Sequence, residues 1–300
     1  MNRAIRTDLA VEAEQLWRES APDTSALPSV RAEESAVRGF SVTTVEILDA
    51  QGEAALNKPV GKYITVELDS LVRREENTFG DAAAVLAETL RRLILLDSTA
   101  NYLVVGLGNR EITPDAVGPA AVDHILITRH LKQKLPEAFA AFRPVSAVCS
   151  GVLGTTGIES SDLVRAVTDE VHPVCVIVID ALASRSLERL CRTVQIADTG
   201  IVPGSGVGNA RQALNRETLG VPVVAIGVPT VVDAATLTLD LAARTGTQLD
   251  AGGFGEIGSM IVTPRDIDKS VRDVAKLIGY SLNLALHDGL SIEDIDLLLS

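Results

Sequence analysis

Two aspartates follow apolar runs of the sequence. Asp115 follows the apolar run 102–108 within GLGNREITPDAVGP (106–119), and Asp180 ends the apolar run VCVIVID (174–180). Both runs are typical of buried parallel strands, and open α/β sheets place their sites at the carboxyl ends of such strands. We therefore expect the two carboxyl groups to share one cleft.

Two carboxyl groups in a partly desolvated cleft can divide acid and base work. Repulsion between like charges raises one pKa, so that one group stays protonated while the other is ionised. The ionised group takes a proton from water, and the protonated group polarises a scissile carbonyl or protonates the leaving amine. Helix capping is the alternative role for each aspartate. On pattern alone, further acidic residues compete for the same chemistry: Glu159, Asp162, Asp198 and Asp233.

A glycine-rich segment, PGSGVGN (203–209), follows the short apolar run TVQIAD (193–198). Its backbone N–H groups could cradle an anion, and the alternative is a turn or a substrate-groove loop. The groove would then be lined by Gly204, Ser205, Gly206, Gly208 and Asn209. The other glycine-rich stretch, GLGN at 106–109, lacks the third glycine of a dinucleotide fingerprint, and no Walker sequence is present. We expect no cofactor.

Other nucleophiles and metal ligands are weakly indicated. Ser184 and Ser186 lack the GxSxG context of a serine hydrolase. No CxxC pair joins Cys149, Cys175 or Cys191, so we expect no disulfide framework, and the first two lie in apolar runs where a free cysteine packs as a small hydrophobe. The four histidines show no HxH, HxxxH or HExxH spacing, so we expect no metal site.

Alternating elements must position these side chains. Segments 41–49 and 60–68 predict a hairpin-like pair of strands, and the N-terminal arm 1–39 should hold one short helix near 9–17. An amphipathic helix is expected at 81–97. Further strands are predicted at 102–108, 145–149, 174–180, 193–198 and 221–229, and further helices at 119–134, 159–171, 183–191, 232–243 and 264–287. This order predicts a three-layer αβα fold around a mostly parallel sheet, without a linker that divides residues 40–300.

Composition narrows the class of protein. Hydrophobic residues make up 46% and aromatic residues 3%, so the core should be aliphatic. A net charge of −13 disfavours direct binding to nucleic acid. No apolar run reaches the ~18 residues of a membrane span, and the N-terminus lacks the apolar core of a signal peptide. We therefore expect a cytoplasmic protein without a membrane partner.

Long segments of the chain resemble the spore germination proteases: RTDLAVEA, VVGLGNREITPDAVGPAAVDHILITRHL, FRPVSAV, GVLGTTGIESSDLV, VIVIDALASRSLERL, VQIADTGIVPGSGVGNARQALNRETLGVPVVAIGVPTVVDA and MIVTPRDID. The resemblance implies an atypical aspartic endopeptidase that degrades small acid-soluble spore proteins in the spore core during germination. It also implies an inactive zymogen that cleaves itself, and a homotetramer. The implied core is a phosphorylase/hydrolase-like α/β fold similar to the hydrogenase-maturation proteases.

The family's motifs map onto particular residues. Its two catalytic aspartates correspond to Asp115 in TPDAVGP and Asp180 in VIDAL. Its substrates are cut after an acidic residue and before an apolar residue and alanine, which predicts cleavage between Asp8 and Leu9. Residues 1–8 would then be a propeptide and 9–300 a single protease domain. The alternative is that Thr7 or Asp8 caps a helix that begins at Leu9.

Two features of the chain bear on how the zymogen is kept inactive and on the tetramer. Arg3 and Arg6 of the propeptide are expected to pair with acidic groups near the cleft and to keep the zymogen inactive. Many family members carry a long polar insertion where this chain has only the short segment 243–264, which leaves the tetramer open.

Two other classes of protein remain as alternatives. A metal-dependent maturation protease on the same fold would need a histidine or a further carboxylate at the site, and no histidine lies near a predicted strand end. A non-enzymatic binding protein is weakened by the incomplete glycine fingerprint and the acidic charge.

Overall fold

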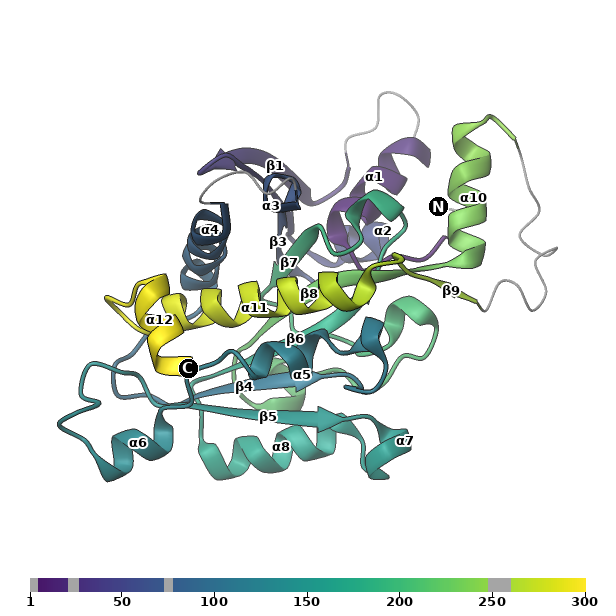
Figure 1. Ribbon diagram of the computed structural model, residues 1–300. Helices are drawn as coiled ribbons and strands as arrows, with labels where there is room; N and C mark the ends of the chain where they lie inside the picture. Colours follow the sequence, from purple (N-terminus) through teal and green to yellow (C-terminus); the bar gives the residue numbers. More distant parts are fainter. Residues whose placement is uncertain (1–4, 21–26, 73–77, 248–259) are drawn as a thin grey trace.

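A computed structural model describes residues 5–20, 27–72, 78–247 and 260–300. Its centre is a nine-stranded sheet in the order β1-β2-β3-β7-β8-β6-β4-β5, with β9 paired to β8 (Figure 1). The strands are β1 (Val30–Val37), β2 (Phe40–Ile47), β3 (Gly61–Glu67), β4 (Tyr102–Leu107), β5 (Val145–Gly151), β6 (Cys175–Ala183), β7 (Thr193–Ala197), β8 (Val223–Asp233) and β9 (Ile261–Val262).

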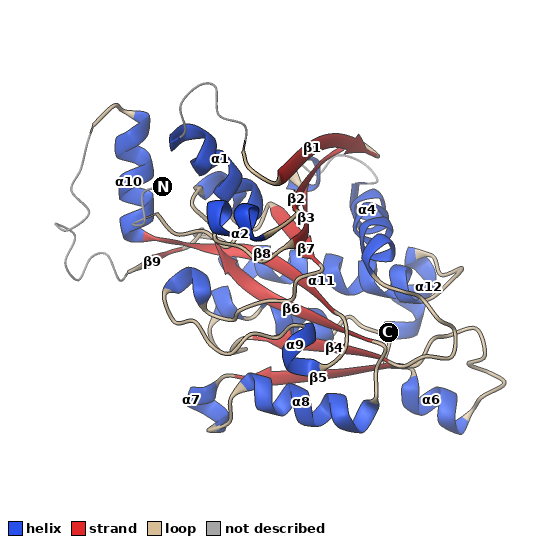
Figure 2. Ribbon diagram, turned by 180° about the vertical axis from the view of Figure 1, so that it is seen from behind, coloured by secondary structure: helices blue, strands red, loops and turns tan. Residues whose placement is uncertain are grey.

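Helices cover both faces of this sheet. The α-helices are α1 (Ala10–Ser20), α2 (Ala50–Leu56), α3 (Asp69–Val72), α4 (Thr78–Leu93), α5 (Val117–Val122), α6 (Arg129–Lys134), α7 (Leu153–Thr156), α8 (Ser160–Val171), α9 (Arg216–Leu219), α10 (Ala234–Arg244), α11 (Ile267–Leu286) and α12 (Ile292–Leu299). Short 3₁₀ turns are η1 (Thr113–Asp115), η2 (Leu187–Arg189) and η3 (Ser205–Val207). In Figure 2 the strands run as one layer between these helices. The predicted three-layer α/β fold is confirmed.

The core lies on both faces of the central strands. Tyr102 and Val104 of β4 pack with α4, α5 and α11, whereas Leu103 and Val105 of the same strand pack with α8 and α9. All of these side chains are buried. A strand buried on both faces must be apolar at every position, which is why 102–108 forms a continuous apolar run. Figure 1 shows α11 and α8 on opposite sides of β4 and β5.

The sheet is mixed, with a parallel part and an antiparallel part. Strands β5, β4, β6 and β8 pair in parallel, and β7, β3, β2 and β1 continue the sheet in antiparallel pairs. The predicted pair at 41–49 and 60–68 is confirmed by the antiparallel ladder of β2 and β3, which α2 connects. The catalytic residues predicted above lie in the parallel part.

The helix predicted at 183–191 is wrong. Strand β6 continues to Ala183, and the connection to β7 contains only the short turn η2. A parallel crossover takes a dozen or more residues, usually with a helix, and this connection is too short for one. Strand β7 consequently runs antiparallel to β8, on the far side of that strand from β6.

Several further elements were not predicted, among them strand β1 and helix α12. Strand β1 is polar and mostly exposed, so it carries neither a clear alternation nor an apolar run, and it pairs with β2 at the edge of the sheet. Helix α12 follows α11 after a short turn and begins with a Ser291–Asp294 capping box. Within the described parts of the chain, no helix is both long and apolar enough to cross a membrane.

Candidate active site

Asp115 and Asp180 both line one cavity of about 590 Å³. Asp180 lies in β6 and is 6% exposed, whereas Asp115 ends the turn η1 that follows β4 and is half-buried. Strands β4 and β6 are parallel neighbours. The two carboxyl groups therefore meet at the same edge of the sheet, as open α/β sheets require of their sites.

Two glycines allow the turn with Asp115 to approach the strand with Asp180. A Cβ atom on Gly118 would lie 2.3 Å from the carbonyl oxygen of Leu107 and 2.5 Å from that of Ile179. A Cβ atom on Gly106 would lie 2.6 Å from the carbonyl oxygen of Gly118. Side chains at either position would separate α5 from β4 and β6. The glycine of TPDAVGP and the first glycine of GLGN therefore serve close backbone packing.

The hydrogen bonds of the two aspartates exclude helix capping. The Asn109 N–H donates to Oδ2 of Asp115 (2.7 Å), and the Ala181 N–H donates to Oδ1 of Asp180 (2.9 Å). Helix α5 has Ala116 at its N-cap, without a side-chain bond, and no helix directly follows Asp180. The capping role considered for each aspartate is therefore wrong.

Burial favours the neutral forms of these carboxyl groups. It raises the pKa of Asp180 well above its usual range, and the neighbouring charge of Asp115 raises it further. Burial also raises the pKa of Asp115, although the hydrogen bond from Asn109 opposes this effect. On the more deeply buried Asp180, burial and the charge of Asp115 raise the pKa together, and the hydrogen bond from Ala181 opposes them.

The competing acidic residues mostly serve other purposes. Asp233 caps α10, Asp198 accepts a hydrogen bond from the backbone of β3, and Asp162 lies exposed in the first turn of α8. Of the four, Glu159 lines the cavity of the aspartates, where Arg211 lies 3.5 Å from its carboxylate. This ion pair with Arg211 suits Glu159 for a structural role in the lining of the cavity.

The carboxylate of Asp8 reaches the same cavity from the N-terminal segment. Its Oδ2 accepts from the N–H of Ala183 (2.9 Å), and its Oδ1 accepts from the hydroxyl of Ser205 (2.8 Å). The backbone N–H of Asp8 donates to the carbonyl of Ala183 (2.9 Å), so the segment runs along the end of β6. The charge of Asp8 adds to the rise in the pKa of Asp180.

The glycine-rich loop covers this N-terminal segment. A Cβ atom on Gly206 would lie 2.0 Å from Oδ2 of Asp8, and one on Gly208 would lie 2.7 Å from the guanidinium of Arg6. Gly204, Gly206 and Asn209 line the cavity of the aspartates. Ser205 and Gly206 also line a second cavity of about 1030 Å³, which residues 5–8 share. The loop thus binds a carboxylate, through the Ser205 hydroxyl.

Known proteins are similar to this chain over nearly its whole length. A sequence model described as "Germination protease" matches residues 9–244. A germination protease of Clostridium tetani is 41% identical, with 98% of each chain covered. One of Caldanaerobacter subterraneus is 43% identical with the same coverage, and one of Bacillus cereus is 37% identical over 95% of this chain and 94% of its own. The chain belongs to the germination protease family. Membership supports a peptidase that acts in spore germination.

In this member of the germination protease family, hydrogen bonds hold both sides of the peptide bond between Asp8 and Leu9. The carbonyl of Asp8 accepts from the side-chain amide of Gln195 (3.2 Å), and the N–H of Leu9 donates to the hydroxyl of Thr7 (3.0 Å). Leu9 is fully buried, and α1 begins at the next residue. Thr7 therefore binds the residue just before α1, and the capping of a helix that begins at Leu9 stays a prediction.

Of the two arginines in the predicted propeptide, the structure describes one. Arg6 lies 3.8 Å from the carboxylate of Asp233, and its backbone N–H donates to the hydroxyl of Thr236 (3.1 Å). These contacts fix Arg6 at the start of α10. Arg3 lies outside the described residues.

Other nucleophiles in this germination protease lie in unsuited surroundings. The Ser184 hydroxyl is buried and donates to Glu12, with no histidine among its partners. Cys175 and Cys191 are buried, but Cys149 is exposed on the edge strand β5, so the prediction that it packs as a small hydrophobe is wrong. No cluster of three or more metal-binding side chains occurs within the described residues.

Sequence reasoning did not identify Asn109, Gln195 or Glu12 as part of this region. Gln195 lies inside the apolar run of β7, and its register places it level with Asp180, with the side-chain-free Gly227 of β8 between them. A glutamine within a buried strand is the one signal in the sequence that could have drawn attention to it, because buried amides need partners.

Proposed function

We propose that this germination protease is an aspartic endopeptidase in which Asp115 and Asp180 activate water. The observation that supports it is the convergence of both carboxyl groups with the carboxylate of Asp8 on one cavity. Asp180 serves as the protonated acid because burial and the neighbouring charge both raise its pKa. Asp115 serves as the ionised base, since it is less buried than Asp180.

The reaction follows from these two protonation states. The carboxylate of Asp115 takes a proton from a water molecule as its oxygen attacks the scissile carbonyl carbon. The protonated Asp180 donates a hydrogen bond to the carbonyl oxygen, which gains negative charge in the transition state. The tetrahedral intermediate then breaks its C–N bond, and the proton carried by Asp115 passes to the leaving amine. A new carboxylate and a free amine are the products.

The zymogen is explained by residues 5–8 in the groove. The Asp8 carboxylate lies beside Asp180, and hydrogen bonds to Gln195 and Thr7 hold the peptide bond that is to be cut. A substrate cannot enter while this segment is in place. We propose that cleavage between Asp8 and Leu9 removes residues 1–8 and leaves 9–300 as the mature protease domain.

The substrates proposed for the mature enzyme are small acid-soluble spore proteins in the spore core. The family resemblance supports this proposal, and so does the carboxylate site formed by Ala183 and Ser205, which suits an acidic residue on the amino side of the cut. We also propose the family's homotetramer. The segment in which this chain is shorter than many family members includes residues 248–259, which lie outside the described part of the structure.

Self-processing tests the proposal directly. The purified chain is incubated at mildly acidic pH, and its mass and N-terminal sequence are followed beside Asp115→Asn, Asp180→Asn and a chelator control. We expect a new N-terminus at Leu9 in the parent, and a rate lower by about 10²–10⁴-fold in each folded variant.

Three outcomes would contradict it. If the parent chain does not cleave itself, the assigned cleavage site is wrong. Processing at the parental rate in either variant would exclude the aspartate pair, and processing that stops with the chelator would favour the metal-dependent alternative.

A further inference from the structure

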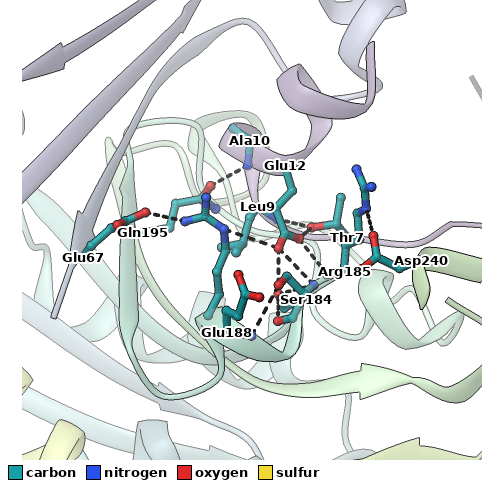
Figure 3. A network of polar contacts seen from close by, with 12 residues as sticks. Thr7, Leu9, Ala10, Glu12, Glu67, Ser184, Arg185, Glu188, Gln195 and Asp240 are labelled. Carbon is teal, nitrogen blue, oxygen red and sulfur yellow. Dashed lines mark hydrogen bonds and ion pairs between the residues drawn. The ribbon is translucent and has the colours of Figure 1, made fainter. Parts of the chain in front are cut away.

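The carboxylate of Glu12 lies next to the peptide bond that the proposed cleavage would open. Glu12 is only 1% exposed, although its side chain is a carboxyl group. The Thr7 hydroxyl donates to its Oε2 (2.5 Å) and at the same time accepts the N–H of Leu9 (3.0 Å). One hydroxyl group therefore separates Leu9 N from the Glu12 carboxylate, as Figure 3 shows.

The same carboxylate holds the chain that follows the catalytic strand. The Arg185 N–H donates to Oε2 (2.6 Å), while the Ser184 hydroxyl (2.8 Å) and the Ser186 N–H (3.2 Å) donate to Oε1. Ser184 directly follows β6, which contains Asp180 and whose last residue, Ala183, binds Asp8. A change at Glu12 is thus transmitted to the end of the catalytic strand within a few residues.

Cleavage after Asp8 changes both partners of the Thr7 hydroxyl. It removes Thr7, so Oε2 loses a donor, and it turns the N–H of Leu9 into an ammonium group. Leu9 itself has reasons to stay in place. It packs with Val11, Leu182 and Ile201, and the next N–H, that of Ala10, donates to Gln195 (2.7 Å).

A buried ammonium group at this position needs an anion. The start of α1 carries the positive end of the helix dipole, which disfavours a further positive charge. An unpaired charge in a buried site is costly, and an acidic partner offsets that cost only with good hydrogen-bond geometry. Glu12 lies in the first turn of the same helix and has just lost a donor.

We propose that Glu12 accepts the ammonium group that cleavage creates at Leu9, and that this ion pair positions residues 184–186 and the end of β6 for catalysis. The inference rests on the proposed cleavage between Asp8 and Leu9. Glu12 is a positioning residue in this scheme, because it acts through β6 and does not touch the substrate. Removal of the propeptide then both empties the groove and completes the site.

Other charged groups also face Glu12. The Nε of Arg189 lies 3.5 Å from Oε1, and Arg189 also pairs with Glu67 at 2.8 Å. Lys58 interacts with the charges of Asp8 and Glu12, and its Nζ donates to the carbonyl of Thr7 (3.4 Å). Lys58 is therefore the competitor that could replace Leu9 as the partner of Glu12 after cleavage.

The test compares two N-termini on the chain from Leu9 to Ser300. None of the described residues that form the four hydrophobic clusters precedes Leu9, so this chain keeps the whole described core. One form is released from a removable upstream tag with a free Leu9 amine. The other carries one extra alanine before Leu9, which turns Leu9 N into an amide. Its own ammonium then lies where Asp8 N donates to Ala183, away from Glu12.

Each form is made in three versions: parent, Glu12→Gln and Glu14→Gln. Glu14 is the matched control, because it is also a buried acid of α1 but pairs with Arg18. The measurements are the melting temperature and kcat/KM on a peptide with the sequence of residues 5–12. The extra alanine should lower the melting temperature by about 3 °C and kcat/KM by roughly tenfold in the parent and in Glu14→Gln. In Glu12→Gln it should change either value little, because the pair is already absent.

The outcomes separate this inference from the proposed function. An equal effect of the extra alanine in Glu12→Gln and in the parent overturns the ion pair, and so does the absence of any effect in the parent, which would leave Lys58 as the partner. A Glu12-dependent shift in melting temperature in a chain that cleaves no peptide would support the ion pair and contradict the protease proposal.

Discussion

Asp180 and Glu12 are both buried carboxyl groups near the end of β6, yet their surroundings differ. Asp180 accepts a hydrogen bond from Ala181 and lies beside the charges of Asp115 and Asp8. Glu12 accepts hydrogen bonds from Thr7, Ser184, Arg185 and Ser186, and Arg189 lies beside it. Burial alone therefore does not decide what a carboxyl group does. Few donors and neighbouring negative charges favour its neutral form, whereas many donors favour its charged form.

Removal of Glu12 should have the largest effect on stability. Glu12→Ala leaves Arg189 and the donors of residues 184–186 without their acceptor, so we expect a loss of about 3–5 kcal/mol in the free energy of unfolding. Chemical denaturation of the full chain measures this. The matched change Glu14→Ala should cost far less, because its partner Arg18 is exposed and can bind water. Equal losses in the two variants would mean that the donors around Glu12 have no special weight.

A substitution that moves Asp115 away from Asp180 should have the second-largest effect. In Gly118→Ala the new methyl group meets the backbone of β4 and β6, so η1 and Asp115 must move away from Asp180. We expect a loss of about 1–3 kcal/mol in stability and a much larger relative loss of self-processing. Denaturation and intact mass report the two effects. Gly80→Ala in α4 is the control, since no atom comes closer than 4.0 Å to its Cβ and alanine favours a helix. Normal processing in Gly118→Ala would show that the close approach is not needed.

Loss of the hydrogen bond that Ser205 donates to Asp8 should have a moderate effect. Ser205→Ala removes the hydroxyl that donates to Asp8, and hydrogen bonds to charged groups contribute about 1.5–3 kcal/mol. We expect self-processing to slow by roughly ten- to a hundredfold, and the same loss in the cleavage of an acidic peptide. A peptide with asparagine in place of the acidic residue should lose much less on the same substitution. Equal losses with both peptides would contradict a site for a carboxylate.

The pH dependence of the melting temperature should show the smallest effect. The folded state keeps a proton on Asp180 where the unfolded chain has lost it, so the parent loses stability as pH rises from about 4 through the raised pKa. Asp180→Asn lacks this loss, and its melting temperature should exceed that of the parent at neutral pH and approach it below about pH 4. Asp49→Asn should show the opposite trend, because hydrogen bonds from Ser29 and from Gln51 lower the pKa of Asp49. A lower melting temperature of Asp180→Asn at neutral pH would show that Asp180 is ionised.

The successes and errors of prediction have different physical causes. The run at 102–108 was recognised because a strand buried on both faces must be apolar throughout. Asp180 stood out because it is an acidic residue that ends such a run, and Asp115 because it lies in the loop that follows one. Strand β1 escaped notice because an exposed edge strand needs no apolar side chains. The helix expected at 183–191 had acceptable helical residues, but the pairing of β6 with β8 extends to Ala183, and only the short turn η2 follows before β7.

Local patterns of burial and charge are enough to predict the α/β class, the two aspartates that follow strands and the acidic-apolar pair at Asp8 and Leu9. Which of these groups lie together depends on the folded chain. Gly118 matters only because two strands pass within contact of it, and Gln195 and Glu12 matter only because the N-terminal segment lies against β6. Contacts between residues more than 170 positions apart leave no local pattern in the sequence, and they form only when the chain folds.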